Sequence, residues 1–217
     1  MINIIKTPAS EITINPKEVA VYLGYYSAKL DGETEKLIAE CTEEFLKAAD
    51  FKACFKKVPV RIENGVDLGF IKVQSRSLEK NLIGCDYAYV FAATTGFGAH
   101  RLLSKNVALS PLKGIVSDCV GSAAIEAFCD KINFSFENPD FLRPRFSPGY
   151  GDLTIENQKD ILSFLDAGKT IGLTLTDSLM MIPVKSVTAI IGIGKEKNKC
   201  KGPGCMICSG VNCPYRD

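Results

Sequence analysis

The chain has 217 residues, of which 46% are hydrophobic and 24% are charged. This composition supplies enough apolar material for a sizeable core, and it excludes a fully disordered chain, a collagen-like repeat and a coiled coil. The formal net charge is only +1, so no electrostatic field points to a nucleic-acid or membrane partner.

The N-terminal segment MINIIKTPASEITINP lacks the apolar core of a signal peptide. No stretch reaches the roughly 18 uninterrupted apolar residues that a membrane-spanning helix needs. We therefore expect a cytoplasmic protein whose thiols stay reduced. The chain has nine cysteines and one histidine, and five of the cysteines have the apolar surroundings of small core residues: Cys41, Cys54, Cys85, Cys119 and Cys129.

Local signals place the secondary structure along the chain. Asn15-Pro16 and Ser110-Pro111 each combine an N-cap residue with proline at the first helical position. Asn64-Gly65 indicates a hairpin, because both residues tolerate positive φ. The expected elements are, in chain order, a strand over 12–14, helices over 17–23 and 34–49, strands over 54–62 and 66–73, a helix over 75–83, a strand over 86–93, helices over 99–103, 111–132 and 154–166, and strands over 173–175, 180–183 and 186–193. Strands and helices alternate, but hairpins are expected towards both ends, so the pattern favours a mixed α+β domain.

The C-terminal segment has a different composition. Residues 1–195 are expected to form one domain, and 196–217 a polar tail that is too poor in apolar residues to build its own core. The tail contains four cysteines with the spacing C-x4-C-x2-C-x4-C: Cys200, Cys205, Cys208 and Cys213. Four thiolates so close together are typical of a metal site, and the spacing leaves an iron–sulfur cluster and a structural zinc ion as alternatives.

Two internal features have simple structural interpretations. Gly96-x-Gly98 follows an expected strand and precedes an expected helix, but Arg101 replaces the third glycine of a dinucleotide-binding loop. An ordinary strand-to-helix turn is therefore favoured. His100 is expected to lie at the surface of that helix.

The most informative internal stretch lies in a long, proline-punctuated loop over residues 133–151. It reads Arg143-Pro-Arg145-Phe-Ser-Pro-Gly149-Tyr150-Gly-Asp152. Long ordered loops are often functional. An arginine here could bind a ligand carboxylate through two parallel hydrogen bonds, and a neighbouring tyrosine could contact a cationic ligand. The alternative is a loop that an arginine–carboxylate pair clamps over the core.

Arg145-Phe-Ser-Pro-Gly149-Tyr150 resembles the R-x-x-x-G-Y motif of the activation domain of vitamin-B12-dependent methionine synthase. Four other stretches resemble the stand-alone bacterial versions of the same family: residues 14–25 (INPKEVAVYLGY), 84–96 (GCDYAYVFAATTG), 117–130 (SDCVGSAAIEAFCD) and 177–193 (DSLMMIPVKSVTAIIGI). The resemblance thus extends over nearly all of residues 10–195. It implies a single C-shaped α+β domain around a bent, mainly antiparallel sheet, followed here by the short Cys-rich tail.

The resemblance also implies a function in methionine biosynthesis. In the family, the domain presents S-adenosylmethionine to cobalamin that has been oxidised to cob(II)alamin, and a one-electron reduction followed by methyl transfer restores methylcobalamin. The chain has no D-x-H-x-x-G motif, so we expect cobalamin only on a partner, either a separate methionine synthase or a related corrinoid protein. An electron donor is a further expected partner, and methyltransferase activity would belong to the complex.

The resemblance assigns candidate ligand contacts. Arg145 matches the arginine that holds the methionine carboxylate, and Tyr150 matches the tyrosine near the reactive end of the ligand. Gly149 belongs to the same motif, and Glu126 falls where the family has a glutamate. Two contacts known from the family have no recognised counterpart here: an aspartate near the N-terminus and an aromatic pair in the closing hairpin.

A function of another class is also compatible with the sequence. The chain could be a non-catalytic interaction protein, with a zinc-clamped tail on a fold descended from the activation domain. Binding of S-adenosylmethionine distinguishes the two hypotheses.

Overall fold

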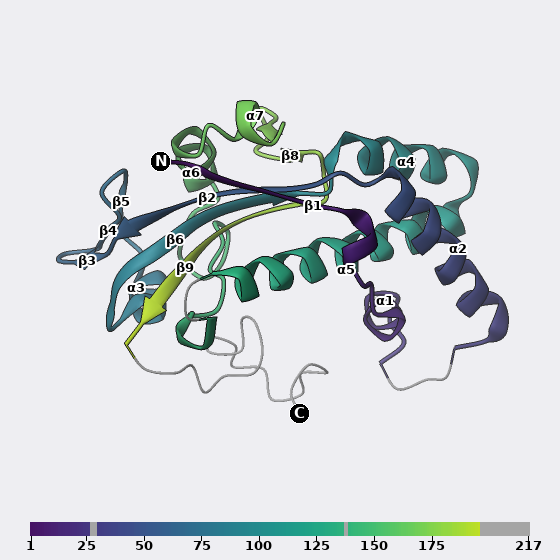
Figure 1. Cartoon of the computed structure of the whole chain (residues 1–217), viewed down its shortest axis with the longest axis horizontal. Helices are drawn as coiled ribbons and strands as arrows, with labels where there is room; N and C mark the ends of the chain where they lie inside the picture. Colours follow the sequence, from purple (N-terminus) through teal and green to yellow (C-terminus); the bar gives the residue numbers. More distant parts are fainter. Residues whose placement is uncertain (27–29, 137–138, 196–217) are drawn as a thin grey trace.

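The computed structural model describes residues 1–26, 30–136 and 139–195. Its main sheet has four antiparallel strands in the order β1 (Asn3–Thr7), β2 (Phe51–Pro59), β6 (Cys85–Thr94) and β9 (Ser186–Gly194). The long strands curve along their length (Figure 1). The expected α+β class around a mainly antiparallel sheet is confirmed.

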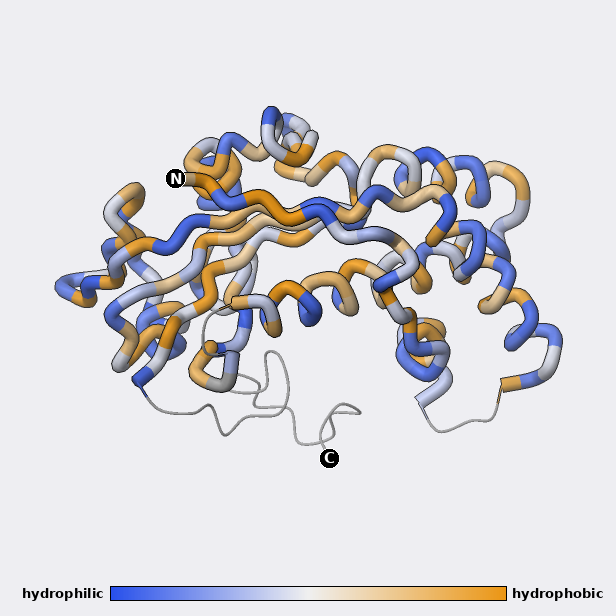
Figure 2. Tube along the Cα trace, in the orientation of Figure 1, coloured by the Kyte–Doolittle hydropathy of each residue, from blue (hydrophilic) through white to orange (hydrophobic). Residues whose placement is uncertain are grey.

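Both faces of this sheet are buried, because side chains alternate between two hydrophobic clusters. In β6, Tyr89, Phe91 and Ala93 belong to one cluster, whereas Val90 and Ala92 belong to the other. This explains why the strand is an almost continuous apolar run in the sequence. Figure 2 shows the apolar positions of the central strands in orange, between helices whose turns alternate between orange and blue.

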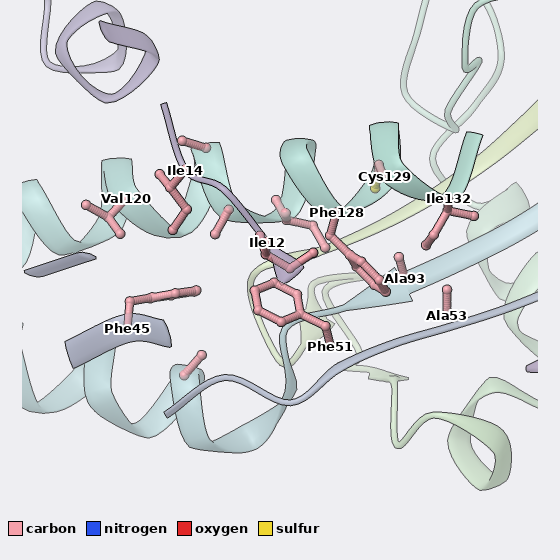
Figure 3. Close-up of a cluster of buried hydrophobic side chains, with 14 of the residues drawn as sticks. Ile12, Ile14, Phe45, Phe51, Ala53, Ala93, Val120, Phe128, Cys129 and Ile132 are labelled. Atoms are coloured by element: carbon pink, nitrogen blue, oxygen red, sulfur yellow. The ribbon is translucent and has the colours of Figure 1, made fainter. Parts of the chain in front are cut away.

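The helix α5 (Pro111–Ser135) packs on the first face. Three further helices pack against α5 and share its hydrophobic cluster: α1 (Pro16–Tyr22), α2 (Gly32–Ala48) and α4 (Gly96–Leu109). The longest, α5, runs along the sheet, as Figure 1 shows. In the core beneath it, Phe51 of β2 packs against Phe128 of α5, with ring centroids 5.2 Å apart (Figure 3).

The opposite face is covered by α3 (Arg76–Leu82), α6 (Asn157–Phe164) and α7 (Ala167–Thr170). Two small antiparallel sheets flank it, one made of β3 (Arg61–Ile62), β4 (Val66–Asp67) and β5 (Lys72–Val73), the other of β7 (Thr174–Leu175) and β8 (Met181–Ile182). The two short 3-10 helices are η1 (Ala9–Glu11) and η2 (Pro139–Phe141). No helix in the described part of the chain is long and apolar enough to span a membrane.

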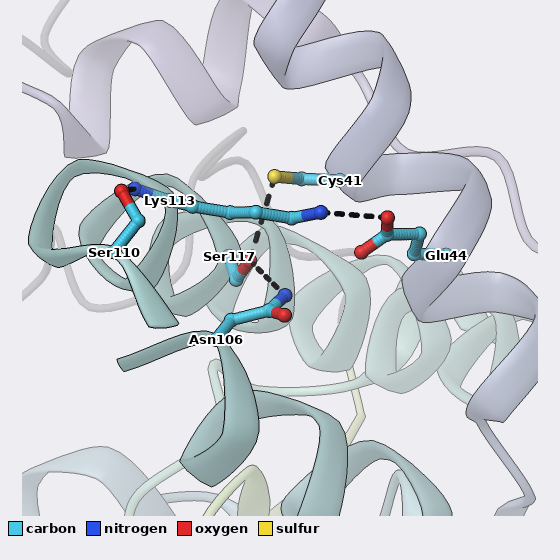
Figure 4. Close-up of polar contacts among 6 residues, drawn as sticks. All are labelled: Cys41, Glu44, Asn106, Ser110, Lys113 and Ser117. Atoms are coloured by element: carbon cyan, nitrogen blue, oxygen red, sulfur yellow. Dashed lines mark hydrogen bonds and ion pairs between the residues drawn. The ribbon is translucent and has the colours of Figure 1, made fainter. Parts of the chain in front are cut away.

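A small polar network joins three of the helices on the first face (Figure 4). Ser117 of α5 accepts a hydrogen bond from the Asn106 side-chain amide of α4 at 2.8 Å and donates one to the Cys41 thiol of α2 at 3.4 Å. Beside it, Lys113 of α5 pairs with Glu44 of α2 at 2.7 Å. These bonds satisfy polar groups in an otherwise apolar interface and fix how the helices sit against one another.

Most expected elements are present, with shifted ends. The expected hairpin is confirmed, since Asn64 and Gly65 adopt φ of 51° and 110° between β3 and β4. Gly96-x-Gly98 opens α4 directly after β6, as expected for a strand-to-helix turn. Gly98 has a packing role as well, because a Cβ there would lie 2.0 Å from the carbonyl oxygen of Ala48.

Other expectations were wrong. Ile12 and Ile14 are buried, but residues 12–14 form no strand, because β1 already occupies the edge beside β2. The helix expected over 154–166 is present only as the shorter α6, and Asp166, with φ of 44°, separates it from α7. Of the five expected core cysteines, Cys119 is only half-buried. Burial raises the pKa of all five thiols, which keeps them protonated. His100 is likewise half-buried, with its Nδ1 atom enclosed by protein.

Candidate functional site

The loop after α5 continues the main sheet beyond β9. Phe146 and Ile190 exchange two backbone hydrogen bonds of 2.8 and 2.9 Å, and Arg143 donates to the carbonyl of Gly192 at 2.8 Å. Because neighbouring residues of an extended segment point to opposite faces, Phe146 enters the cluster beneath α6 while Arg145 points towards α5. Backbone pairing thus determines on which face the Arg145 guanidinium lies.

Arg145 is held by two carboxylates of α5. Its terminal nitrogens donate to Glu126 at 2.6 Å and to Asp130 at 2.7 Å, and its side chain is only 7% exposed. Burial by itself lowers the pKa of Arg145, but the interactions with its neighbours Cys129, Glu126 and Asp130 together offset it, so the pKa is raised and the guanidinium stays charged. The acids are four residues apart, so they share one face of the helix.

Tyr150 is carried by a tight turn that follows Arg145. Gly149 adopts φ of 91°, which favours glycine, and its N–H donates to the carbonyl of Leu153 at 2.8 Å. The Tyr150 ring packs edge-on against the Phe146 ring, with the ring centroids 6.1 Å apart, and Tyr150 is 53% exposed. The turn therefore positions Tyr150 while leaving about half of the residue exposed.

Asp152 fastens this turn to the start of α3. Its carboxylate accepts hydrogen bonds from the Ser75 hydroxyl at 2.6 Å and from the backbone N–H groups of Arg76 and Ser77 at 2.8 and 3.0 Å. These bonds lower the pKa of Asp152 well below its ordinary value. Gly151 completes the contact, because a Cβ there would lie 2.5 Å from the Ser77 hydroxyl oxygen.

These elements enclose a cavity of about 510 Å³. It lies between α1, α5, the loop that carries Arg145, and the start of β9. Its size is within the usual range of small-molecule sites, roughly 300–1,000 Å³. The lining residues are Tyr22, Glu126, Arg145, Ser147, Pro148, Tyr150, Gln158, Met181, Ser186, Val187 and Thr188.

Three of the four candidate ligand contacts therefore meet in one cavity: Glu126, Arg145 and Tyr150. Gly149 does not line it but shapes the turn between two residues that do. The four candidate metal ligands, Cys200, Cys205, Cys208 and Cys213, lie outside the described residues. Within residues 1–26, 30–136 and 139–195, no group of three or more His, Cys, Asp or Glu side chains could hold a metal ion.

Sequence reasoning missed the contribution of α1 to this site. Tyr22 lines the cavity, and its hydroxyl donates to Glu18 one helical turn earlier at 3.4 Å. Burial raises the pKa of Glu18, the bond from Tyr22 lowers it, and the charges of Glu126 and Asp130 raise it further. The i, i+4 spacing of acids on the apolar helix α5 was a usable signal for Asp130, whereas nothing local in the sequence indicates that α1 packs beside it.

A model of the family "Vitamin B12 dependent methionine synthase, activation domain" matches residues 78–199. The chain belongs to this family. The matched region includes β6, α5, β9 and the cavity-lining residues Glu126, Arg145 and Tyr150.

A solved structure supports the same fold over more of the chain. The reactivation domain of MetH, crystallised with bound AdoHcy (S-adenosylhomocysteine), matches with a TM-score of 0.66 and 14% sequence identity, covering 91% of this chain and 80% of that one. No curated protein matches. The fold is therefore shared well beyond the residues that the family model matches.

The hydrogen bonds of Asp152 predict a specific pH dependence of stability. Because the native pKa is lowered, its carboxylate stabilises the fold above the ordinary pKa of about 3.9, and this contribution is lost as the pH falls towards the native value. Asp152→Asn should therefore lower the urea midpoint at about pH 6, and the difference from wild type should shrink at about pH 3. Asp177→Asn, which removes an exposed turn carboxylate, is the control. A deficit of Asp152→Asn that is equal at both pH values would contradict the structural role.

Proposed function

We propose that this domain binds S-adenosylmethionine in the cavity at Arg145. We further propose that it thereby supports reductive methylation of cob(II)alamin on a separate methionine synthase or a related corrinoid protein. The observation that carries the proposal is a buried guanidinium in the wall of a cavity that also presents a carboxylate and an accessible tyrosine. The bound AdoHcy of the similar MetH domain agrees with this choice of ligand.

The lining residues fit the methionine part of the ligand. A guanidinium has five N–H donors, and the bonds to Glu126 and Asp130 use one on each terminal nitrogen of Arg145. Arg145 would also donate to the ligand carboxylate, and Glu126 would accept from the ligand ammonium. Both contacts are charge-assisted and set the orientation of the amino-acid part.

Tyr150 would contact the reactive end of the ligand. Its ring is accessible beside the cavity, and an aromatic face attracts a cation such as a sulfonium group. In the proposed reaction, one electron reduces the partner's cob(II)alamin, and the methyl group then passes from sulfonium to cobalt, leaving S-adenosylhomocysteine. The contribution of this chain is to hold the methyl group towards the partner, which lowers the entropic cost of bringing the reactants together.

Substitution of Arg145 tests the binding site. Arg145→Lys keeps the charge but loses the forked geometry, so S-adenosylmethionine should bind at least about tenfold more weakly in isothermal titration. Arg143→Lys is the matched control, because Arg143 belongs to the same loop and does not line the cavity. Thermal unfolding of each variant separates loss of binding from loss of fold.

Two results would contradict the proposal. One is the absence of S-adenosylmethionine binding to wild-type protein, and the other is equal binding to wild type and Arg145→Lys. Either would favour the alternative of a non-catalytic interaction protein.

We also propose that residues 196–217 form a separate metal-binding tail after the domain. Its support is the spacing of Cys200, Cys205, Cys208 and Cys213, which suits either an iron–sulfur cluster or zinc. Reductive methylation consumes an electron, and an iron–sulfur cluster in the tail would offer a route for it. Zinc would instead give the tail a structural or docking role.

Metal analysis of protein purified without oxygen distinguishes these roles. We expect stoichiometric metal in the wild type and its loss in a Cys205→Ser, Cys208→Ser double variant, because thiolates are the ligands. Cys119→Ser is the control, because this half-buried cysteine lies on α5 and not in the tail, and this variant should retain the metal. Iron together with acid-labile sulfide would support electron supply by a cluster in the tail. Zinc without iron would exclude that role. A metal-free wild type would contradict the proposal that the tail binds metal.

A further inference from the structure

The outer edge of β9 is only partly paired. The loop after α5 pairs with it at Phe146 and Ile190, which exchange two backbone hydrogen bonds. In a continued antiparallel ladder, Pro148 would be the next residue of the loop to bond, and it would lie opposite Thr188. Proline has no N–H to donate, and the chain turns away at this point, since Gly149 adopts φ of 91°. The loop therefore leaves the first residues of β9 without a partner strand on this side.

The backbone groups of Ser186 and Thr188 point to this open edge. In an antiparallel ladder, the N–H and C=O groups of successive residues alternate between the two sides of a strand. Ile190 bonds outwards to the loop, whereas the Lys185 carbonyl bonds inwards, where it accepts from the N–H of Thr95 at the end of β6. The even-numbered residues are thus directed outwards. Within the described part of the chain, no residue bonds to the Ser186 carbonyl or to the Thr188 N–H on that side.

The cavity follows this edge and not a single face of the sheet. Ser186, Val187 and Thr188 all line it, although the side chains of successive strand residues point to opposite faces. Glu126 lines the cavity from α5 on one face, and Gln158 lines it from α6 on the other. Ser186 and Thr188 are only 8% and 1% exposed, so their edge is enclosed. A small flat ring in the cavity, and not a further strand, is the partner that fits there.

The two open backbone groups form a donor–acceptor pair. They belong to residues two positions apart, the arrangement to which a single residue of a parallel neighbouring strand would bond. Adenine presents the complementary pair on one edge, because its N6 amino group donates and its ring atom N1 accepts. Hypoxanthine, which has a carbonyl in place of the amino group, reverses both, since its O6 accepts and its N1–H donates. A strand edge of this kind therefore distinguishes the two bases.

We infer that the open edge of β9 is the base-binding part of the cavity and that it makes the site specific for a 6-aminopurine. The Thr188 N–H donates to N1 of the adenine ring, and the Ser186 carbonyl accepts from the N6 amino group. This inference rests on the proposed function of the same site, in which Arg145 and Glu126 hold the amino-acid end of the ligand. Pairing with β6 already fixes both backbone groups, so they lose little conformational entropy when the base binds.

Titration with two matched ligands tests the base specificity. S-inosylhomocysteine differs from S-adenosylhomocysteine only in the base, which is hypoxanthine in place of adenine. Wild-type protein should bind S-inosylhomocysteine at least about tenfold more weakly, because two backbone groups would then face groups of the same kind. Both ligands keep the same amino-acid part, so the contacts to Arg145 and Glu126 act as an internal control.

Amide hydrogen exchange followed by NMR tests the position of the base. The Thr188 N–H should exchange at least about tenfold more slowly in protein saturated with S-adenosylhomocysteine than in protein saturated with S-inosylhomocysteine. Ile190 is the control, because its N–H already bonds to Phe146 and should exchange equally in the two complexes.

The outcomes separate this inference from the proposed function. Equal affinity for the two ligands would overturn the base specificity and leave the proposed function intact. A preference for S-adenosylhomocysteine with equal exchange of Thr188 in the two complexes would show that the base is bound elsewhere, and it would overturn the assignment to β9. Wild-type protein that binds neither these ligands nor S-adenosylmethionine would overturn the proposed function as well.

Discussion

The ion pairs of Arg145 are the interaction on which the arrangement of the cavity depends. Glu126 and Asp130 hold a guanidinium whose side chain is 7% exposed, and they tie the loop beyond β9 to α5. The two acids are 35% and 57% exposed and are screened by water, whereas the Arg145 charge is buried and depends on them for compensation. The loop, the turn that carries Tyr150 and the face of α5 are therefore coupled through a single side chain.

This coupling makes the two interpretations of the loop compatible. From the sequence, an arginine that clamps the loop and an arginine that binds a ligand were alternatives. In the structure Arg145 is clamped by α5 and still lines the cavity, since a guanidinium has more donors than two carboxylate bonds require. A binding group fixed in this way loses little side-chain entropy when a ligand arrives. Asp152 likewise fixes the turn that carries Tyr150, because its carboxylate bonds to residues at the start of α3.

Local signals predicted the parts of the fold that depend on neighbouring residues, such as the helices that begin at Asn15-Pro16 and Ser110-Pro111 and the turn at Asn64-Gly65. The resemblance around Arg145 predicted three residues that share the cavity. Neither approach predicted the role of Asp152, because its partners are remote in sequence: Asp152 bonds to Ser75, 77 positions away. Likewise, β1 is a short strand with exposed residues, and its pairing with β2 has no local signature.

A crystal structure of the protein with S-adenosylmethionine tests the central claim most directly. The account predicts the ligand carboxylate on the Arg145 guanidinium, the ammonium at Glu126, and the sulfonium methyl group directed to the accessible side at Tyr150. A second cavity of about 530 Å³, between α1 and α2 and lined by Tyr25 and Ile38, offers a clear contrast. Ligand bound in that second cavity, with the cavity at Arg145 empty, would contradict the account.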